Sequence, residues 1–534
     1  MFQYLFYRAL TFVGIGFFMV LVRSIVTVSS FTMVSRILGF CRDILIAAFL
    51  GAGVLADVFF VAFKIPNLFR RLFAEGAFNA AFVPQFSGIL EHEGKINAKV
   101  FAEQALAVLL WSMLIFVVFF QIMMPYLMVG FAPGFKNNTE QFDLAILLTR
   151  ITFPYLLFIS LASLMSGVLN SLGKFAAAAA TPILLNICLI SSLVILSKHT
   201  ETPAHALAWG VSVAGILQLV WLLLNCGWAG FWLRLIRPRF TDNIRKMFRR
   251  ILPVAIGAGV YQASLLIDTI IASLLPSGSI SFLFFADRVN QLPLGVVGVA
   301  VGTALLPLMS RQLGAADYKG ALESQNRAVE FSLFLTLPAT VALVVLAQPI
   351  ISVLFERGAF DTASVKATGD ALAMYALGLP AYVMVKALVP GFFAREDTVT
   401  PVKIAAAALL INLVLNLILM GPFLHLGIAI ATAISAWCNV LALAFILKRR
   451  GYFTLDSRNL VRLPRMVVAS FIMGAVIFFS VLFFNNFLTF GISVKFISVA
   501  ILVFGGLIIY CSLVFLFGAV KWNELKQIYQ RKAT

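Results

Sequence analysis

The stretch SRILGFCRDILIAAFLGAG, residues 35–53, decides the fold, because an apolar helical run carries charges and is repeated later in the chain. Its last twelve residues, RDILIAAFLGAG (42–53), align with IDTIIASLLPSG (267–278) at a shift of 225, pairing Asp43 with Asp268. Three weaker matches lie at shifts of 219 to 226: AFVPQFS (81–87) with ALLPLMS (304–310), TFPYLL (152–157) with GLPAYV (378–383), and ATPILLN (180–186) with VTPVKIA (399–405). Such a long internal period predicts two similar lobes.

The composition is that of a membrane protein with many helices. The 534 residues are 62% hydrophobic and 12% charged, and the mean hydropathy is +1.01. A bilayer core about 30 Å thick needs roughly 20 apolar residues per helical crossing. Fourteen segments meet this need: 24–50, 54–88, 100–130, 143–171, 176–197, 204–232, 248–275, 280–312, 325–355, 365–393, 401–421, 425–447, 464–487 and 493–518.

The predicted fold is therefore an all-α polytopic membrane protein with 14 transmembrane helices. An even number of crossings separates the repeat copies, so the copies share an orientation across the membrane. Two pseudo-symmetric six-helix lobes around a central cavity, followed by two C-terminal helices, fit this pattern, which is typical of transporters. The predicted parts are an N-terminal extension (1–18, interfacial or a misassigned start), an N-terminal lobe (19–232), a basic cytoplasmic linker (233–247), a C-terminal lobe (248–450), and two further helices with a basic cytoplasmic tail (451–534).

The net charge of +18 is distributed as a topology signal and not as a nucleic-acid-binding surface. Of the 40 basic residues, those in predicted external loops are only Lys136, Lys198, Arg357, Lys366 and Lys495. An excess of Lys and Arg in cytoplasmic loops orients membrane proteins, so both termini are predicted to be cytoplasmic. The dense basic loops at 234–250 and 448–465 would also attract anionic membrane lipids.

No metal site or disulfide is predicted. The five cysteines, Cys41, Cys188, Cys226, Cys438 and Cys511, have hydrophobic surroundings and no ligand-like spacing. The four histidines, His92, His199, His205 and His425, form no paired motif. Buried apolar cysteines are the simplest interpretation.

Charged residues gather on the first two predicted spans, which carry Arg36, Arg42, Lys64, Arg70 and Arg71. Arg36 and Asp43 are about two helical turns apart and share a face, and the neighbouring stripe carries Ser35, Gly39 and Arg42. Gly39 would allow a ligand or another backbone to approach closely. On the second span, residues within about 80° of one another are Asp57, Lys64, Asn67, Arg71 and Glu75.

The second lobe has fewer such charges: Asp268, then Asp287 and Arg288, with Asn290 and Gln291 beside them. Two interpretations stay open. Ion pairs such as Arg71–Glu75 or Arg42–Asp57 would lock helices together. A hydrated cationic cavity would instead bind an anionic group, and we favour it because charges in a bilayer usually face water or a partner. Arginine suits phosphate, because its fork binds two oxygen atoms.

A second polar set comprises Asn412, Asn416, Thr432 and Asp268. One carboxylate with amide, hydroxyl and carbonyl oxygens suits Na⁺. Interhelical hydrogen bonds between Asn and Thr are the alternative.

Three stretches resemble the MurJ (MviN) lipid II flippases of the multidrug/oligosaccharidyl-lipid/polysaccharide (MOP) exporter superfamily. They are SRILGFCRD (35–43), ADVFFVAFKIPNLFRRLFAEGAFNAAFVPQF (56–86) and ADRVNQLPLGVVGVAVGTALLP (286–307). The resemblance covers about residues 19–520. It implies a transporter in the bacterial inner membrane that is not an enzyme. The implied substrate is the undecaprenyl-diphosphate-linked peptidoglycan precursor, exported to the periplasmic leaflet for cell-wall synthesis.

The resemblance also implies cavity residues at Ser35, Arg36, Arg42, Asp57, Arg70, Arg71 and Arg288, with Asn67, Glu75 and Ser281 nearby. Some members of the family have a Na⁺ site at positions matching Asp268, Asn412, Asn416 and Thr432. Gln291 stands where some members carry an acidic residue, and Asn416 stands where a carboxylate can occur. Peptidoglycan synthases or divisome proteins are expected partners.

The expected mechanism is alternating access, in which the lobes rock around the cavity. No cofactor is expected beyond coupling to Na⁺ or to the membrane potential. The alternatives are another exporter of the superfamily, such as a polyprenyl-linked oligosaccharide flippase or a drug/cation antiporter, and a membrane glycosyltransferase. The antiporter would show an acid-rich cavity. The glycosyltransferase would need a carboxylate motif, for which REDT (395–398) is the nearest candidate.

Overall fold

A computed structural model describes residues 2–71, 78–488 and 491–520. Side chains are described at 26–71, 78–251, 262, 266–298, 300–483, 491 and 493–520. Within these ranges every regular element is a helix and no strand occurs. The all-helical class predicted from the sequence is confirmed. Helices suit a bilayer because each helix satisfies its own backbone hydrogen bonds.

The chain folds as two compact units, residues 1–270 and 271–534. The two units are distinguished by how their helices pack, and the boundary between them lies inside the helix α10. It does not test the lobe bounds expected from the sequence, which stay a prediction. In the first unit, the elements are α1 (Phe2–Leu50), α2 (Val54–Phe69), α3 (Asn79–His92), α4 (Gly94–Ile122), α5 (Met124–Phe131), the 3₁₀ helix η2 (Pro133–Asn137), α6 (Thr139–Thr152), α7 (Tyr155–Ser171), α8 (Phe175–Ile195), the 3₁₀ helix η3 (Leu196–Lys198), α9 (Pro203–Trp228) and most of α10 (Asp242–Ser273).

The second unit contains the rest of the helices. They are α11 (Ser279–Gly314), α12 (Tyr318–Val345), α13 (Ala347–Phe355), α14 (Thr362–Ala376), α15 (Leu379–Leu388), α16 (Pro390–Phe393), α17 (Val399–Arg449), α18 (Ser457–Leu488) and α19 (Ile492–Leu516). Several helices of both units begin with a side-chain cap. Asn138, Asp317 and Asp361 accept a hydrogen bond from the backbone N–H three residues on. Such caps satisfy N–H groups that the helix itself leaves open.

Ten candidate membrane spans, judged by length and hydropathy, lie among the residues that the structure describes. They are Gly94–Ile122, Thr139–Ser171, Phe175–Lys198, Pro203–Trp228, Ser279–Gly314, Tyr318–Val345, Thr362–Phe393, Val399–Arg449, Ser457–Phe483 and Ser493–Leu516. The protein is therefore a multi-pass membrane protein.

The 51-residue helix α17 is two helices joined at a kink. Leu424 there has non-helical dihedral angles (φ 50°, ψ −131°), and Pro422 lies just before it. Proline removes a helical hydrogen bond and is a common cause of kinks. The kink lies between the two spans that the sequence predicts at 401–421 and 425–447.

Helix α1 runs without a break from Phe2 to Leu50. Its 49 residues correspond to about 74 Å at 1.5 Å per residue, more than twice the bilayer core of about 30 Å. Residues 2–18 of the predicted extension are thus continuous in their backbone with the first span, and the interfacial role of the extension stays a prediction.

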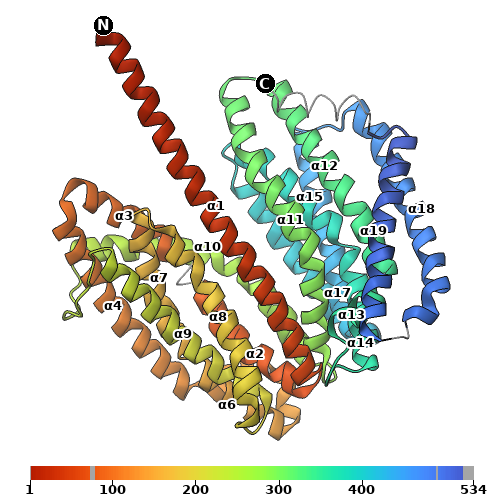
Figure 1. Ribbon diagram of the computed structural model, residues 1–534, viewed down its shortest axis with the longest axis horizontal. Helices are drawn as coiled ribbons and strands as arrows, with labels where there is room; N and C mark the ends of the chain where they lie inside the picture. The colour runs from red at the N-terminus through yellow and green to blue at the C-terminus, as the bar shows by residue number, and fades with distance from the viewer. Residues whose placement is uncertain (1, 72–77, 489–490, 521–534) are drawn as a thin grey trace. The chain divides into compact units, whose positions relative to one another are not determined.

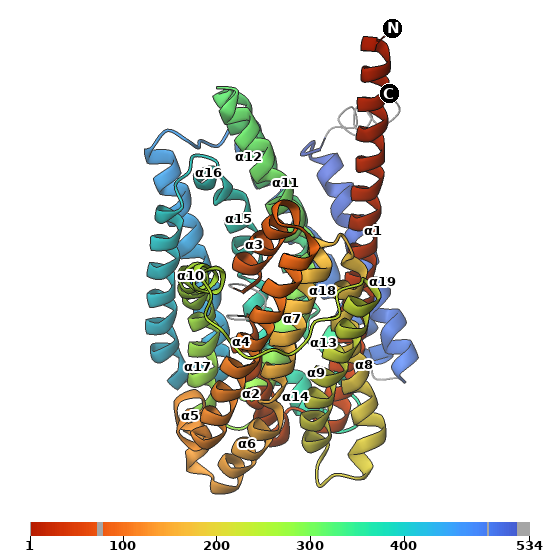
Figure 2. The same ribbon diagram turned by 90° about the vertical axis from the view of Figure 1, so that its left-hand side faces the viewer.

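In the first unit, α7, α8 and α9 lie side by side (Figures 1 and 2). Stacked phenylalanine rings fill the core between α3, α4 and the segment after α9. The ring centroid of Phe82 lies 5.3 Å from that of Phe78 and 5.6 Å from that of Phe101. Phe86 meets Phe231 edge-on at 5.9 Å. These contacts join α3 and α4 to the segment after α9.

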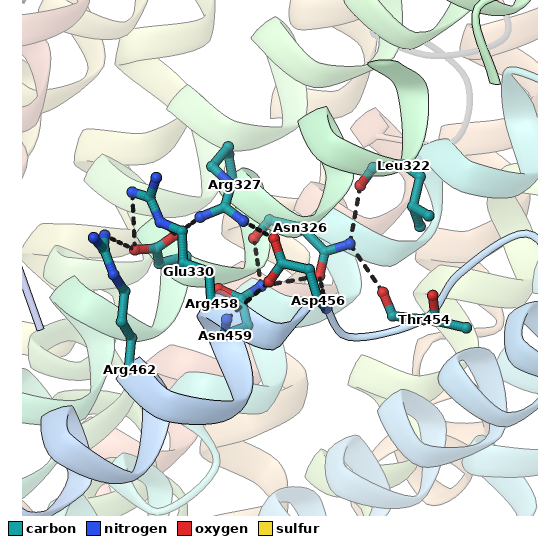
Figure 3. A network of polar contacts seen from close by, with 9 residues as sticks. All are labelled: Leu322, Asn326, Arg327, Glu330, Thr454, Asp456, Arg458, Asn459 and Arg462. Carbon is teal, nitrogen blue, oxygen red and sulfur yellow. Dashed lines mark hydrogen bonds and ion pairs between the residues drawn. The ribbon is translucent and has the colours of Figure 1, made fainter. Parts of the chain in front are cut away.

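In the second unit, the antiparallel pair α18–α19 lies beside α12 (Figure 1). Figure 3 shows the polar network that joins the start of α18 to α12. Glu330 of α12 is 7% exposed and accepts from Arg462 at 2.7 Å, and it pairs with Arg458 at 3.2 Å. Arg327 contacts both Glu330 and Asp456. Three guanidinium groups thus converge on one buried carboxylate.

Asparagine side chains complete this network (Figure 3). Asn459 of α18 donates to the Oδ1 of Asn326 on α12 at 2.9 Å, and Asn326 donates to the Thr454 carbonyl at 3.0 Å. Asp456 caps α18 by accepting from the Asn459 N–H at 2.8 Å. Both the loop before α18 and α18 itself are therefore hydrogen-bonded to α12.

A second polar cluster joins α19 to the loop between α13 and α14. Lys495 Nζ lies 2.9 Å from Glu356 Oε2, and Thr362 Oγ1 donates to Glu356 Oε1 at 3.3 Å. Ser352 also donates to Glu356. Burial acts to raise the pKa of Glu356, but these hydrogen bonds and the Lys495 charge together lower that pKa below its ordinary value of 4.5.

We expect Glu330→Ala to lower the free energy of unfolding of the second unit by about 3 kcal/mol, because removal of one partner leaves buried arginine charge uncompensated. Thermal unfolding of the purified protein in detergent measures the effect as a lower midpoint. Glu323→Ala, at an exposed position two turns earlier on α12, is the matched control. Equal midpoints for the two variants would contradict the role given to Glu330.

The lowered pKa of Glu356 predicts that the stability of the protein depends on pH. A carboxyl whose pKa is lowered by folding stabilises the protein above its unfolded-state pKa, and the contribution disappears as the pH falls through the folded-state pKa. Glu356→Gln should therefore lower the thermal midpoint at pH 7, and its difference from the unsubstituted protein should shrink once the pH falls below 4.5. Glu140→Gln, at an exposed position on α6, should show no such trend. A difference that is constant with pH would refute the assignment.

Candidate functional site

Arg42 of α1 is buried and paired with its neighbour in the sequence. It is 9% exposed, and its Nε and Nη2 donate to Asp43 Oδ1 at 3.0 and 2.7 Å. Its Nη1 donates to Asn186 Oδ1 of α8 at 2.9 Å. Since a buried charge needs a compensating partner, Asp43 makes the interior position of this guanidinium tolerable.

Asn186 is the residue around which the predicted stripe of α1 is arranged. Its Nδ2 donates to the Ser35 carbonyl at 3.0 Å and lies 3.4 Å from Ser35 Oγ. A Cβ at Gly39 would lie 3.6 Å from the same nitrogen. Ser35, Gly39 and Arg42 therefore surround one buried amide. Asn186 is not among the site residues predicted from the sequence, although a lone amide in the apolar run of α8 is a signal that could have found it.

Arg36 differs from Arg42 in its exposure and in its polar contacts. It is exposed and makes no hydrogen bond or ion pair with the described part of the chain. Asp43, two turns further along α1, is 3% exposed and paired with Arg42. The structure thus brings Asp43 together with Arg42 and leaves Arg36 accessible.

Helix α2 carries further predicted residues. Asp57 lies in the first turn and is 2% exposed. Lys64, partly buried, donates to the Thr269 hydroxyl of α10, so α2 and the end of α10 are joined by a polar contact within the first unit.

The end of α2 holds the other basic residues. Arg70 Nε donates to Asn67 Oδ1 at 3.0 Å, and Asn67 donates to the Phe63 carbonyl at 3.1 Å. Arg71 is exposed. Glu75 lies outside the described residues, so the expected Arg71–Glu75 pair stays a prediction.

In the second unit the predicted residues lie on α11. Ser281 is buried, and the Arg288 guanidinium lies over the Phe284 ring at 4.7 Å from its centroid. Gln291 donates to the Asp287 carboxylate. The glutamine at 291 thus acts as a neutral donor to the acid one turn earlier.

The second polar set is partly assembled on α17. Asn416 donates to Asn412 Oδ1 at 3.2 Å, and Asn412 Nδ2 lies 3.4 Å from Thr432 Oγ1, so the amides link the two halves of the kinked helix. Asp268 lies on α10 in the first unit, and its place in this set stays a prediction. The searched residues contain no group of three or more His, Cys, Asp or Glu side chains that could hold a metal ion.

The REDT motif (395–398) has structural contacts. Asp397 accepts from the Thr400 N–H at 2.9 Å and pairs with Arg450 at 2.5 Å. The hydrogen bonds from Thr400 and Arg450 hold the pKa of Asp397 well below its usual range. Arg395 lies over the Tyr452 ring at 4.3 Å. These contacts attach the loop before α17 to the loop after it, which accounts for the motif without a catalytic role.

Comparison with known proteins gives a consistent result. The family described as "Lipid II flippase MurJ" matches residues 46–511. A probable lipid II flippase MurJ of Rhizobium tropici is 46% identical over 463 residues, which are 86% of this chain and 87% of the relative. A probable lipid II flippase MurJ of Rhizobium meliloti (strain 1021) is 41% identical over 97% of both chains.

Solved structures agree with the sequence relatives. A lipid II flippase MurJ in an inward closed conformation matches with a TM-score of 0.74 and 26% identity, over 92% of this chain and 98% of that one. An inward-facing multidrug transporter of the MATE family, in the MOP superfamily, matches with a TM-score of 0.64 and 12% identity, over 80% of this chain and 98% of that one. The second match concerns the fold alone.

We predict that the two α1 arginines differ in their effect on stability. Arg42→Gln removes the guanidinium that neutralises Asp43 and should cost about 3 kcal/mol of unfolding free energy. Arg36→Gln should change it by less than about 0.5 kcal/mol, as is usual at exposed positions. Thermal unfolding in detergent compares the two. A larger loss for Arg36→Gln would contradict the contacts described above.

Proposed function

The chain belongs to the lipid II flippase MurJ family, and from this premise we propose that it moves lipid II from the cytoplasmic to the periplasmic leaflet for cell-wall synthesis. As a member it is a transporter of the bacterial inner membrane and not an enzyme. The match of the family to residues 46–511 carries the assignment. That match includes Asp57 and Lys64 of α2, Arg70 and Arg71 directly after it, and Arg288 of α11.

The proposed architecture has fourteen crossings in two lobes around a central cavity. The ten candidate spans, with the kinked α17 counted as two, are joined by the three predicted at 24–50, 54–88 and 248–275. Two units of similar length are in keeping with the internal repeat. Alternating access would then open the cavity to each side of the membrane in turn.

Arg36, Arg42 and Arg288 are the proposed contacts for the diphosphate and the peptide carboxylates of the substrate. A diphosphate is costly to bring into hydrocarbon, and arginine forks replace its hydration with charge-assisted hydrogen bonds. Arg36 is exposed, so its guanidinium would be accessible to such a group. Arg42 uses three N–H groups on Asp43 and Asn186, so two of the five N–H groups of a guanidinium remain for a phosphate oxygen.

The basic excess of these residues favours an anionic substrate over a cationic drug. Lys64, Arg70 and Arg71 add to it, and Asp43 and Asp57 offset it in part. An antiporter for cations would need the opposite sign on the cavity wall.

Coupling to Na⁺ or to the membrane potential is the proposed driving force. For Na⁺, the oxygen atoms of Asn412, Asn416 and Thr432 with the Asp268 carboxylate would supply hard ligands. For the potential, moving one charge across the membrane is worth about 2.3 kcal/mol per 100 mV.

The proposed topology places both termini in the cytoplasm, in line with the positive-inside rule. The basic loops at 234–250 and 448–465 would then meet the anionic inner leaflet. Peptidoglycan synthases or divisome proteins are proposed as partners, since they would consume the exported precursor.

We predict that Arg36→Ala or Arg288→Ala abolishes lipid II export while the protein is made at a normal level. The assay is complementation of a cell that lacks its own export activity, with the precursor measured in each leaflet. Arg239→Ala, in an exposed loop, is the control and should complement fully. Full export by either cavity variant would overturn the assignment of that arginine.

A further inference from the structure

We propose that Asn186 of α8 is a positioning residue for Arg42 and thereby for the diphosphate group of the substrate. The inference rests on the proposed function, in which Arg42 contacts that diphosphate. Asn186 itself would not touch the substrate. It would hold the guanidinium at a fixed angle on the wall of the cavity.

Three contacts define this role. Asn186 Oδ1 accepts from Arg42 Nη1 at 2.9 Å, while Asn186 Nδ2 donates to the Ser35 carbonyl at 3.0 Å. Asn186 is 5% exposed, so both ends of its amide are engaged inside the protein. The amide packs closely against α1, since a Cβ at Gly39 would lie 3.6 Å from Asn186 Nδ2, at ordinary van der Waals distance.

A neutral amide makes both contacts without changing the charge of the site. An aspartate would accept from Arg42 but could not donate to the Ser35 carbonyl, and a leucine could do neither. A second carboxylate beside Asp43 would also place two negative charges against the single positive charge of Arg42. A site with net negative charge would repel a diphosphate.

Asn186 also determines which edge of the guanidinium stays available. Asp43 engages Nε and Nη2, which form one edge of the fork. Without Asn186, Arg42 Nη1 would lose its hydrogen-bond acceptor, and the guanidinium could rotate while it keeps its contact with Asp43. Held at both edges, the guanidinium keeps one orientation, so less entropy is lost when a phosphate binds.

The first test measures lipid II affinity and thermal midpoint of the full-length protein in detergent. We expect Asn186→Leu to weaken lipid II binding about tenfold, the scale of one hydrogen bond to a charged group. Gln218→Leu is the matched control, because Gln218 is buried on α9 and its amide donates across helices to the Thr181 carbonyl at 2.7 Å. It should lower the thermal midpoint by a similar amount and leave the affinity within twofold.

Asn186→Asp keeps the proposal falsifiable if the leucine variant fails to fold. It retains the acceptor for Arg42, so it should unfold closer to the unsubstituted protein than Asn186→Leu does. Its lipid II affinity should nevertheless fall by at least tenfold, because of the added negative charge. Unchanged affinity in Asn186→Asp would overturn the proposal.

A double-mutant cycle shows whether Asn186 acts through Arg42. Asn186→Leu added to Arg42→Gln should cause no further loss of affinity, whereas independent effects would multiply and overturn the inference. The outcomes also distinguish the proposed contact of Arg42 with the substrate from the positioning role of Asn186. Normal binding by Arg42→Gln would refute the proposed contact together with the inference, while weak binding by Arg42→Gln and normal binding by Asn186→Leu would refute the inference alone.

Discussion

The cost of placing charge in hydrocarbon is the constraint on which the rest of the structure depends. A charged side chain at the centre of a bilayer costs about 2.5–3.5 kcal/mol on insertion scales, so it needs water or a partner. Arg42 meets this constraint through Asp43 and Asn186. Arg36, on the same helix, is exposed. One helix therefore carries one cation that is paired inside the protein and one that is exposed.

The same constraint explains how the trailing helices are attached. The Glu330 cluster fixes the start of α18 to α12, and the pair of Glu356 with Lys495 fixes the start of α19 to the end of α13. One turn after Glu330 on α12, the Phe334 carbonyl accepts from the Tyr510 hydroxyl of α19 at 2.9 Å. Contacts near both ends make α18–α19 an integral part of the second unit. Any groove that these helices form would move with that unit.

Patterns within single helices could be predicted from the sequence, whereas contacts between helices could not. The all-helical class follows from the apolar runs, and the kink of α17 follows from Pro422 between two such runs. The partner of Arg42 lies 144 residues away on α8, and no helical periodicity relates the two positions. The Glu330 cluster was missed for a similar reason, because its arginines count as loop charges in a topology argument. The ion pairs expected from the sequence are Arg71–Glu75, one turn apart, and Arg42–Asp57, on two different spans, whereas the structure pairs Arg42 with its neighbour Asp43.

The pairing of Arg42 also bears on selectivity. A free arginine in a wet cavity attracts any anion, but a guanidinium already held by a carboxylate gives up part of that attraction. A ligand must then supply enough negative charge, at the right place, to bind the two N–H groups of Arg42 that Asp43 and Asn186 do not engage. A diphosphate meets this demand better than a single carboxylate, because it offers more charge and several oxygen atoms. Preorganised donors of this kind favour the ligand whose charge matches them, so the pairing with Asp43 that makes Arg42 tolerable in the bilayer would also make it discriminating.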